Sequence, residues 1–495
     1  MTRKKIIIKN TISNIAMQFI TAIIPLLILP HILRYWGGEI YGIFILALSV
    51  QAFSYILNSA IHITLMKYIS EAYALKDEGR LNSIVNDFWV IAFLNNFIVF
   101  FAIILIGAFG LGWMNISPAL METAKNVFYV TGAFGILAGC FGSPDGIIVG
   151  MQKIHENNIF RLIESVGKII AIIVVLKWKL SLVFYVFCIS MLPVVVKIIQ
   201  VFYIRKLIPA LTFNPVKYFD FKELKILAKY SSYQIMNQVG DILMYTTDKL
   251  IIQKIMGAAS VTLYEVANKP NLFFERFISL PLSALLPACS EAYAKRDMKF
   301  INTVLLKGTR MYLLLVLPVI FSCIIYMKAI FSFWLGAEYG HAAFCAQLFL
   351  ASYLVAAPFK IFSHVMISKG PVKEYAFSKF IYALINIPLS IWGVMKFGIM
   401  GGILVTLGFW VFVYSPMNIY IMIREKFNVM TFLYKIAPFY VLLSCQLLAA
   451  KLCLAVLPAH NLFQLLVNIG FIISFYIIIS FFFLLDSSER KLLIS

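Results

Sequence analysis

The sequence predicts an all-α integral membrane protein with about fourteen transmembrane helices, arranged as two parallel six-helix lobes and a C-terminal helix pair. Composition is the first observation that predicts this class. The 495 residues are 62% hydrophobic and 13% charged, whereas soluble domains are about 25% charged. The second observation is that apolar runs of about 20 residues, the length of a spanning helix, recur from Ile12 to Leu485. They leave no room for a soluble domain.

The predicted spans follow one another with short connections. The fifth and sixth are separated only by a few residues around Trp178. In chain order the spans cover residues 12–33, 40–63, 88–110, 125–149, 160–177, 181–203, 227–255, 261–287, 309–331, 341–366, 378–396, 399–421, 436–457 and 461–485.

The distribution of Lys and Arg is the third observation. The basic segment Met1–Asn10 precedes a long apolar run. This apolar run lacks a small-residue cleavage site and is too long for the hydrophobic region of a signal peptide, so we interpret the run as the first transmembrane helix. With the N-terminus in the cytoplasm, the inside segments carry 24 Lys and Arg, and the outside loops carry only Arg34 and Lys179. Because cytoplasmic loops are enriched in Lys and Arg, this asymmetry predicts that both termini are cytoplasmic. It also accounts for the charge of +20 without a nucleic-acid partner.

The chain contains an internal repeat. Residues Ser70–Val85 align without gaps to Ser290–Leu305, with seven of sixteen positions identical. The copies follow the second and eighth predicted helices, so the two halves share one orientation, as in transporters that bind their substrate between parallel repeats. The alternative is chance similarity of two amphipathic cytoplasmic segments. The repeat predicts an N-terminal lobe over 1–205, a cytoplasmic linker over 206–226, a C-terminal lobe over 227–425 and an appended segment, with the helix pair and a cytoplasmic tail, over 426–495.

Four predicted helices, the first, second, seventh and eighth, carry polar residues at steps of three or four, which place them on one face. These polar faces predict a hydrated cavity between the lobes. The alternative is that the polar residues form hydrogen bonds between helices in a bundle without water. The third, ninth and fourteenth helices have nearly apolar middles and are expected to face lipid or neighbouring helices. The polar stripes are Asn14, Gln18 and Thr21; Gln51, Tyr55, Asn58 and His62; Gln234, Gln238, Asp241, Tyr245 and Asp248; and Glu265, Lys269 and Arg276.

Ionisable groups inside the bilayer cost about 2.5–3.5 kcal/mol each and usually face a cavity or one another. Basic groups in such a path suit an anionic substrate, and the planar guanidinium of Arg276 suits phosphate. The alternative for Lys168 and Lys269 is that each neutralises the carboxylate four residues before it, Glu164 or Glu265. The carboxylates of Asp241 and Asp248 are candidates for a coupling cation or proton, or for structural hydrogen bonding.

The segment Gly142–Gly146 predicts a broken helix end, because Pro and Gly interrupt helices. Asp145 is expected to cap this end or to meet water. Three histidines in the predicted spans, His31, His62 and His364, are isolated, and no metal site is expected.

Enzyme signatures are absent from the sequence. It contains no Walker A motif, no acidic cluster and no nucleophile elbow. The longest predicted outside loop, Leu111–Ala124, is too short to build an extracytoplasmic catalytic site. The sequence therefore predicts a transporter without cofactors, rather than an enzyme.

Three local motifs point to a known family: Asn10-Thr-Ile-Ser-Asn14, Leu33-Arg-Tyr-Trp-Gly-Gly-Glu-Ile-Tyr-Gly42, and Asp248–Gly257 leading into Val261–Ala267. With these motifs and its predicted helices, the chain resembles the multidrug/oligosaccharidyl-lipid/polysaccharide exporter superfamily. Within that superfamily it resembles the Wzx-type polysaccharide flippases. The resemblance covers nearly the whole chain and implies a MATE-like fold.

The resemblance implies two lobes that rock to expose a central cavity alternately to the two sides of the bacterial inner membrane. The implied cargo is an undecaprenyl-diphosphate-linked oligosaccharide of O-antigen, capsule or exopolysaccharide, moved by an ion gradient. Implied partners are this lipid-linked oligosaccharide, membrane lipids and other glycan assembly proteins. The positions that match a cargo role are Lys168, Lys249, Lys269, Arg276, Gln51 and Asn58, and those that match an ion-coupling role are Asp241, Asp248 and Glu265.

Two transporter alternatives share this architecture. A cation-coupled multidrug exporter of MATE type would favour carboxylates and aromatic walls without net positive charge. The lipid II flippase branch typically has several arginines in its first two helices, where this chain has only Arg34. An O-antigen polymerase or ligase, the enzyme alternative, would show a large extracytoplasmic loop.

Overall fold

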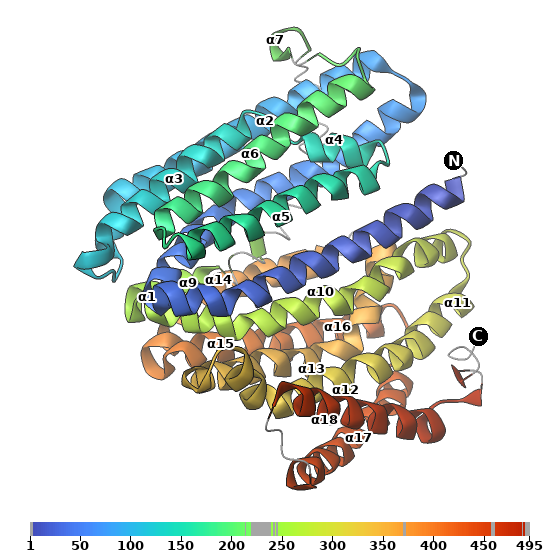
Figure 1. The fold of residues 1–495 in the computed structure, drawn as a ribbon. Helices are drawn as coiled ribbons and strands as arrows, with labels where there is room; N and C mark the ends of the chain where they lie inside the picture. Colours follow the sequence, from blue (N-terminus) through green and yellow to red (C-terminus); the bar gives the residue numbers. More distant parts are fainter. Residues whose placement is uncertain are drawn as a thin grey trace. The chain divides into compact units, whose positions relative to one another are not determined.

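The computed structural model describes residues 3–212, 214–218, 239–240, 243, 246–369, 373–456, 461–487 and 489–490. Every regular element within these residues is a helix (Figure 1). The chain forms two compact units. The first comprises Met1–Thr262 with Lys379–Ile387, and the second comprises Leu263–Ser378 with Pro388–Ser495. Each unit is described by itself.

The first unit begins with α1 (Arg3–Leu75), a helix of 73 residues that is kinked at Gly37. At about 1.5 Å per residue, a straight helix of this length would far exceed the ~30 Å hydrocarbon core. Gly37 adopts φ 76°, a conformation that favours glycine because it has no Cβ. The kink therefore divides α1 into two parts, which contain the predicted spans 12–33 and 40–63.

Helices α2, α3 and α6 lie side by side in this unit (Figure 1), and α1 packs against α2, α4 and α5. The predicted spans 160–177 and 181–203 correspond to α5 and α6. The further elements of the unit are α2 (Glu78–Leu105), η1 (Ile106–Gly110), η2 (Leu111–Trp113), η3 (Pro118–Leu120), α3 (Met121–Gly139), α4 (Pro144–Gly150), α5 (Ile154–Lys177), α6 (Leu182–Leu207), α7 (Pro215–Tyr218) and α9 (Thr247–Met256).

The predicted span 125–149 is broken, as its Pro and Gly residues indicate. Helices α3 and α4 meet at an angle of 44°, and Gly142 between them has φ +63°. The ammonium of Lys197 on α6 donates hydrogen bonds to the carbonyl oxygens of Ala138 (3.1 Å) and Gly142 (2.7 Å). Since the last carbonyls of a helix have no partner within it, Lys197 stabilises the break.

The start of the predicted linker packs on α2. Asn82 donates to the carbonyl of Ala210 and accepts from the amide of Thr212, and Asn86 donates to the carbonyl of Thr212. Both asparagines are buried. Two consecutive turns of α2 therefore hold the backbone that leaves α6.

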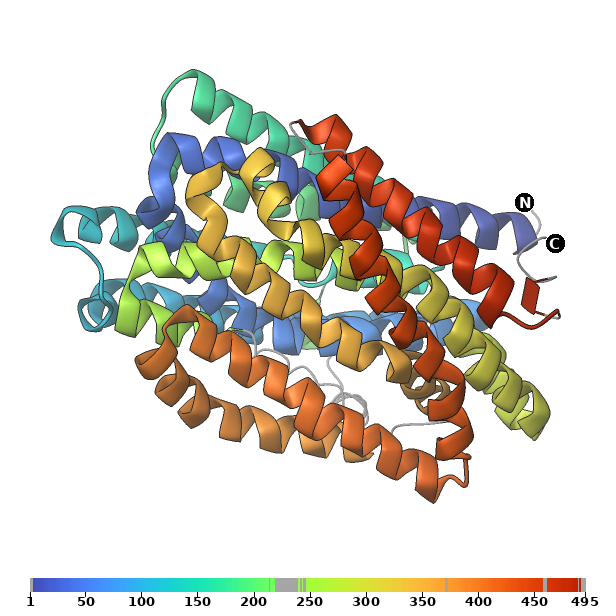
Figure 2. The ribbon, with the colours of Figure 1, turned by 90° about the horizontal axis from the view of Figure 1, so that it is seen from below.

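In the second unit, α12 packs against α13, α17 and α18. Figure 2 shows α17 and α18 side by side, in red. Helices α10 and α14 each contribute residues to both units. The elements are α10 (Ala258–Ala294), α11 (Met298–Thr303), η4 (Val304–Gly308), α12 (Thr309–Trp334), η5 (Ala337–Tyr339), α13 (Gly340–Lys369), α14 (Lys373–Phe397), α15 (Ile399–Phe409), η6 (Trp410–Tyr414), α16 (Ser415–Arg424), α17 (Val429–Val456), α18 (Leu462–Ile479) and η7 (Ser480–Leu484).

The two copies of the sequence repeat form the same helix–turn–helix corner. Asp77 caps α2 by accepting from the amide of Arg80 at 2.9 Å, and Asp297 caps α11 by accepting from the amide of Phe300 at 2.9 Å. The residues before these caps, Lys76 and Arg296, have φ of 55° and 57°. The repeat is therefore a repeat of local structure as well as of sequence.

Among the described residues, nine helices are long and apolar enough to cross a membrane, or ten if the bent pair α3 and α4 counts as one span. The chain is a multi-pass membrane protein. The count of fourteen stays a prediction: α1 contains two predicted spans, and most of the predicted span 227–255 lies outside the described residues. Helices α5 and α10 each carry an ion pair, Glu164–Lys168 and Glu265–Lys269.

Helices α14 and α15 approach so closely that only glycine fits between them. A Cβ on Gly401 would lie 1.9 Å from the carbonyl oxygen of Gly393. We expect Gly401→Ala to lower the melting temperature of the purified protein by several degrees, because backbone must move to admit the methyl group. Gly470→Ala on α18 is the control, since its Cβ meets nothing within 4 Å. Equal melting temperatures for the two variants would contradict this close approach.

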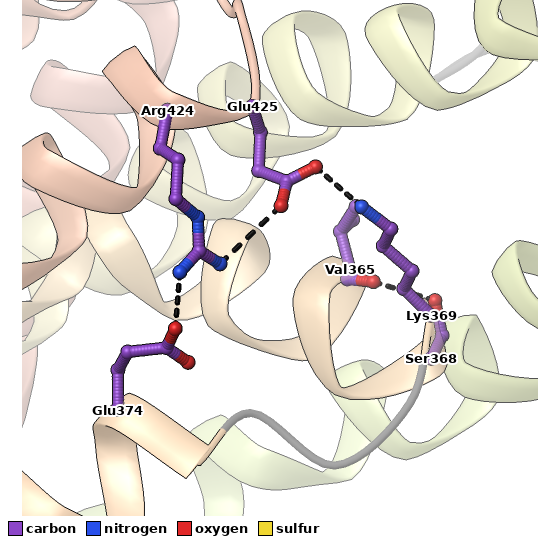
Figure 3. A network of polar contacts seen from close by, with 6 residues as sticks. All are labelled: Val365, Ser368, Lys369, Glu374, Arg424 and Glu425. Carbon is purple, nitrogen blue, oxygen red and sulfur yellow. Dashed lines mark hydrogen bonds and ion pairs between the residues drawn. The ribbon is translucent and has the colours of Figure 1, made fainter.

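One end of the second unit is held by a network of charges (Figure 3). Glu425, after α16, accepts from Lys369 at 2.5 Å and from Arg424 at 3.3 Å, and Arg424 also donates to Glu374 at the start of α14. The carbonyl of Ser368, next to this network, accepts from the hydroxyl of Ser290 on α10. The network therefore ties together the ends of α13, α14 and α16.

The network predicts a pH dependence. Hydrogen bonds from Lys369 and Arg424 hold the pKa of Glu425 below its usual range. A carboxylate whose pKa is lowered in the folded state stabilises that state at pH values above the usual carboxylate pKa of about 4.3. This stabilisation is lost as the pH falls through the lowered pKa. We expect Glu425→Gln to cost at most about 1 kcal/mol near pH 7, because the pair is partly exposed. The difference in melting temperature from the unmodified protein should shrink as the pH falls below ~4 and vanish below the lowered pKa of Glu425; a difference that does not shrink in this range would contradict the assignment.

Candidate functional site

A cavity of about 510 Å³ opens among the helices of the first unit. Five helices line it: α1, α2, α3, α5 and α6. Its lining is mixed, with apolar walls and a group of amide, hydroxyl and charged side chains. The polar and charged lining residues are Gln51, Asn58, Asn96, Thr131, Glu164, Lys168, Ser190 and Lys197.

An asparagine cluster joins α1 to α2 at this cavity. Asn58 donates to the side-chain oxygen of Asn96 (3.0 Å) and accepts from the amide of Asn95 (3.1 Å). Asn96 also donates to the carbonyl of Ala92. Asn95 and Asn96 are buried, and Asn58 is half-buried. These hydrogen bonds hold the asparagine side chains in one orientation, so their amide groups offer hydrogen-bond donors and acceptors to the cavity at fixed positions.

Two basic groups from different helices reach the cavity. Lys168 on α5 forms an ion pair with Glu164 at 2.5 Å, and its side chain remains 44% exposed. Lys197 on α6 is engaged by the carbonyls at the α3–α4 break. Lys168 is therefore the basic group with free surface for a ligand, while Lys197 holds the backbone that lines the site.

His62 and Asp145 form a pair, which corrects the expectation that His62 is isolated. The Nε2 atom of His62 lies 3.0 Å from a carboxylate oxygen of Asp145. His62 is therefore not isolated, and Asp145 has a side-chain partner besides its place at the broken helix end. The expectation missed this contact because the two residues are distant in the sequence, and only the packing of α4 against α1 brings them together.

The second unit has its own polar cluster on α10. Glu265 and Lys269 form an ion pair at 2.5 Å, with side chains only 6% and 16% exposed. One turn further, Asn271 donates to the side-chain oxygen of Asn268, and its carbonyl accepts from the hydroxyl of Tyr353. This cluster follows the predicted stripe of the eighth span and extends it with two asparagines.

The other predicted site residues that the structure describes do not line the cavity of the first unit. Asp248 on α9 is fully buried, and Lys249 beside it is half-buried. Arg276 is exposed on α10. Asp241 lies outside the described residues, as do Gln234, Gln238 and Tyr245 of the same predicted stripe.

The structure thus brings three predicted residues, Gln51, Asn58 and Lys168, into one cavity in the first unit. Glu265 and Lys269 form a pair in the second unit. Sequence reasoning missed Asn96, Thr131 and Lys197 as cavity residues. The adjacent Asn95 and Asn96 in the otherwise apolar third span were the available signal, because paired amides in such a run need partners.

The family described as "Polysaccharide biosynthesis protein" matches residues 7–293 of the chain. A curated relative is the "probable low-salt glycan biosynthesis flippase Agl15" of Haloferax volcanii. It is 22% identical over 187 residues, which are 38% of this chain and 40% of that relative. The matched part therefore spans two-fifths of the relative's length.

Solved structures of similar fold cover more of the chain. The lipid II flippase MurJ in an inward closed conformation is 19% identical, with a TM-score of 0.72 over 98% of this chain and 100% of that one. A multidrug resistance MATE family transporter in an outward-facing conformation is 13% identical, with a TM-score of 0.61 over 86% and 96%. These likenesses confirm the predicted MATE-like membrane fold.

The relatives named above are flippases and a transporter, in agreement with the prediction of a transporter rather than an enzyme. The match to the family over residues 7–293 covers more than half of the chain. The chain belongs to the polysaccharide biosynthesis protein family.

Proposed function

We propose that the protein is a flippase that moves a lipid-linked oligosaccharide across the membrane by alternating access. The cavity of the first unit carries this proposal, because it joins a partly exposed ammonium to a cluster of fixed amides. Family membership and the flippase relative support it.

The chemistry of the cavity fits such a cargo. An ammonium such as that of Lys168 binds phosphate oxygens through charge-assisted hydrogen bonds. The amides of Gln51 and Asn58 supply donors and acceptors that match sugar hydroxyls. The volume of about 510 Å³ lies within the range of ~300–1,000 Å³ typical of small-ligand sites. Lys168 therefore binds the diphosphate, and the amides contact the sugars next to it.

The proposal extends to the finer points that the sequence suggested. The cargo is an undecaprenyl-diphosphate-linked repeat unit of O-antigen, capsule or exopolysaccharide, carried across the bacterial inner membrane with both termini in the cytoplasm. The lobes are those predicted, 1–205 and 227–425, with the linker 206–226 between them and the helix pair after residue 425. Lys249, Lys269 and Arg276 are further cargo contacts, and Asp241, Asp248 and Glu265 are the coupling carboxylates.

A multidrug exporter is the second candidate, favoured by the fold shared with MATE transporters. Its cationic substrates would be disfavoured by the net positive charge of the cavity, which is lined by Lys168 and Lys197 but by one carboxylate, Glu164. The likeness to a lipid II flippase supports the fold. It does not select the function, because one fold can host many functions. We therefore place the glycan flippase first.

Deletion of the gene in its host tests the proposal. The deletion strain should lose the surface glycan and accumulate lipid-linked repeat units on the cytoplasmic side, because synthesis continues while translocation stops. A plasmid copy of the gene should restore the glycan. Normal surface glycan together with new drug sensitivity would instead establish the exporter.

A further inference from the structure

A second hollow, of about 470 Å³, lies at one end of the second unit. The start of α11, the start of α17 and the chain after η7 meet there. Its lining is rich in charge: four basic and two acidic side chains among ten residues. The lining residues are Met298, Lys299, Asn302, Thr303, Leu306, Lys307, Arg310, Lys435, Asp486 and Glu489.

The charges of this hollow do not balance. Arg310 and Glu489 form an ion pair at 2.9 Å, and both are buried. Arg310 also donates to the carbonyl of Leu484, and Glu489 accepts from the backbone amide of Asp486 at 2.8 Å. The charges of Arg310 and Glu489 neutralise each other, and their hydrogen bonds hold the buried side of the hollow, its floor, in place. Among the lining residues, basic side chains outnumber acidic ones by four to two, so the lining is positive.

The hollow lies at the level where membrane-spanning helices end. The apolar segments Met298–Trp334 and Val429–Ala455 begin at it, and Leu462–Leu484 ends at it. Large apolar and aromatic side chains around it are exposed, among them Met298 (44%), Tyr434 (80%) and Phe483 (81%). Aromatic side chains are typical of the boundary between hydrocarbon and headgroups.

We propose that this hollow binds the phosphodiester headgroup of an anionic phospholipid. Lys299, Lys307 and Lys435 surround the phosphate, and the acyl chains lie along the exposed apolar side chains beside it. A lipid fits better than a soluble anion, because basic pockets between transmembrane helices recognise anionic headgroups and because the apolar rim offers contacts that a free anion lacks. The site is separate from the cargo cavity of the first unit and does not depend on the proposed function.

Lipid binding would secure the C-terminal helix pair. The headgroup joins Lys299 on α11 and Lys435 on α17, and the floor pair joins α12 to the segment after η7. The bound lipid would thereby link α11 to α17, which are far apart in the sequence. We expect phosphatidylglycerol to raise the melting temperature of the full-length protein.

The test compares two triple variants of the full-length protein in phosphatidylcholine nanodiscs, with and without phosphatidylglycerol. The site variant is K299Q/K307Q/K435Q. The control, K328Q/K396Q/K451Q, removes three exposed lysines of the same unit that lie outside the hollow. Bound lipid is counted by native mass spectrometry. The site variant should bind phosphatidylglycerol roughly 100-fold more weakly, at about 1 kcal/mol per lysine, and the control should bind like the unmodified protein.

Three outcomes would overturn the proposal. They are equal binding by the two triple variants, equal retention of phosphatidylcholine and phosphatidylglycerol by the unmodified protein, and a rise in melting temperature with inorganic phosphate as large as with phosphatidylglycerol. The last outcome would assign the hollow to a free anion. If the site variant fails to fold, the single substitutions K299Q, K307Q and K435Q replace it, and each should weaken binding about 5-fold.

Discussion

Replacing Lys168 with glutamine should reduce cargo translocation by roughly 10- to 100-fold, because a hydrogen bond to a charged group contributes about 1.5–3 kcal/mol. Lys168 has an exposed part of its side chain in the cavity, beside the amides of Gln51 and Asn58. Glutamine keeps most of the length and loses the charge. The measurement is surface glycan in a deletion strain carrying the variant, with the amount of protein in the membrane determined in parallel.

The ion pair with Glu164 gives this prediction its sharpest control. If Lys168 serves only to neutralise Glu164 within the membrane, the double variant Glu164→Gln/Lys168→Gln should recover function, because no unpaired charge remains. If Lys168 binds the diphosphate, the double variant should stay as defective as the single one. Lys177→Gln is the matched surface control, since Lys177 lies on the same helix, is exposed and does not line the cavity. Recovery in the double variant would remove Lys168 from the site.

Much of the fold could be predicted because the length of an apolar run is a property of neighbouring residues. The apolar runs predicted α5 and α6, and the Ser70 and Ser290 segments predicted an internal repeat. The structure adds that equivalent aspartates of the two copies, Asp77 and Asp297, cap helices. The shortness of the break at Gly37 was not predictable from hydropathy. The charged stretch around Arg34 reads as a loop, whereas in the structure helix lies on both sides of the kink with no loop between the two parts.

The site was only partly predictable, because a cavity collects single residues from several helices. The stripe on the second span identified Gln51 and Asn58, since they recur at helical spacing. Asn96 and Thr131 stand in apolar helices with no periodic polar face, so periodicity carries no signal for them. The pair of His62 with Asp145 and the bonds of Lys197 to the α3–α4 break depend on how α4 and α6 pack. Packing of this kind is set by the whole unit rather than by any one segment.

Replacing Arg310 with methionine should destabilise the protein by about 3–5 kcal/mol, because it leaves a buried charge without its partner. Glu489 is 1% exposed and pairs with the Arg310 side chain, which is 10% exposed. Arg310 also donates to the carbonyl of Leu484 and lies 5.8 Å from the ring centre of Phe439. It therefore anchors the segment after η7 against α12 and α17. Thermal unfolding of the purified variant measures the loss.

The double variant Arg310→Met/Glu489→Met separates lost charge from lost packing. Two apolar side chains in place of a buried ion pair are often neutral or stabilising, so the double variant should regain most of the stability that the single variant loses. Arg424→Gln provides the exposed comparison, because its pair with Glu374 is about 40% exposed on both sides and should contribute no more than about 1 kcal/mol. An Arg310→Met variant as stable as Arg424→Gln would show that water reaches Glu489, and the hollow would then lack the fixed floor on which its lysines are arranged.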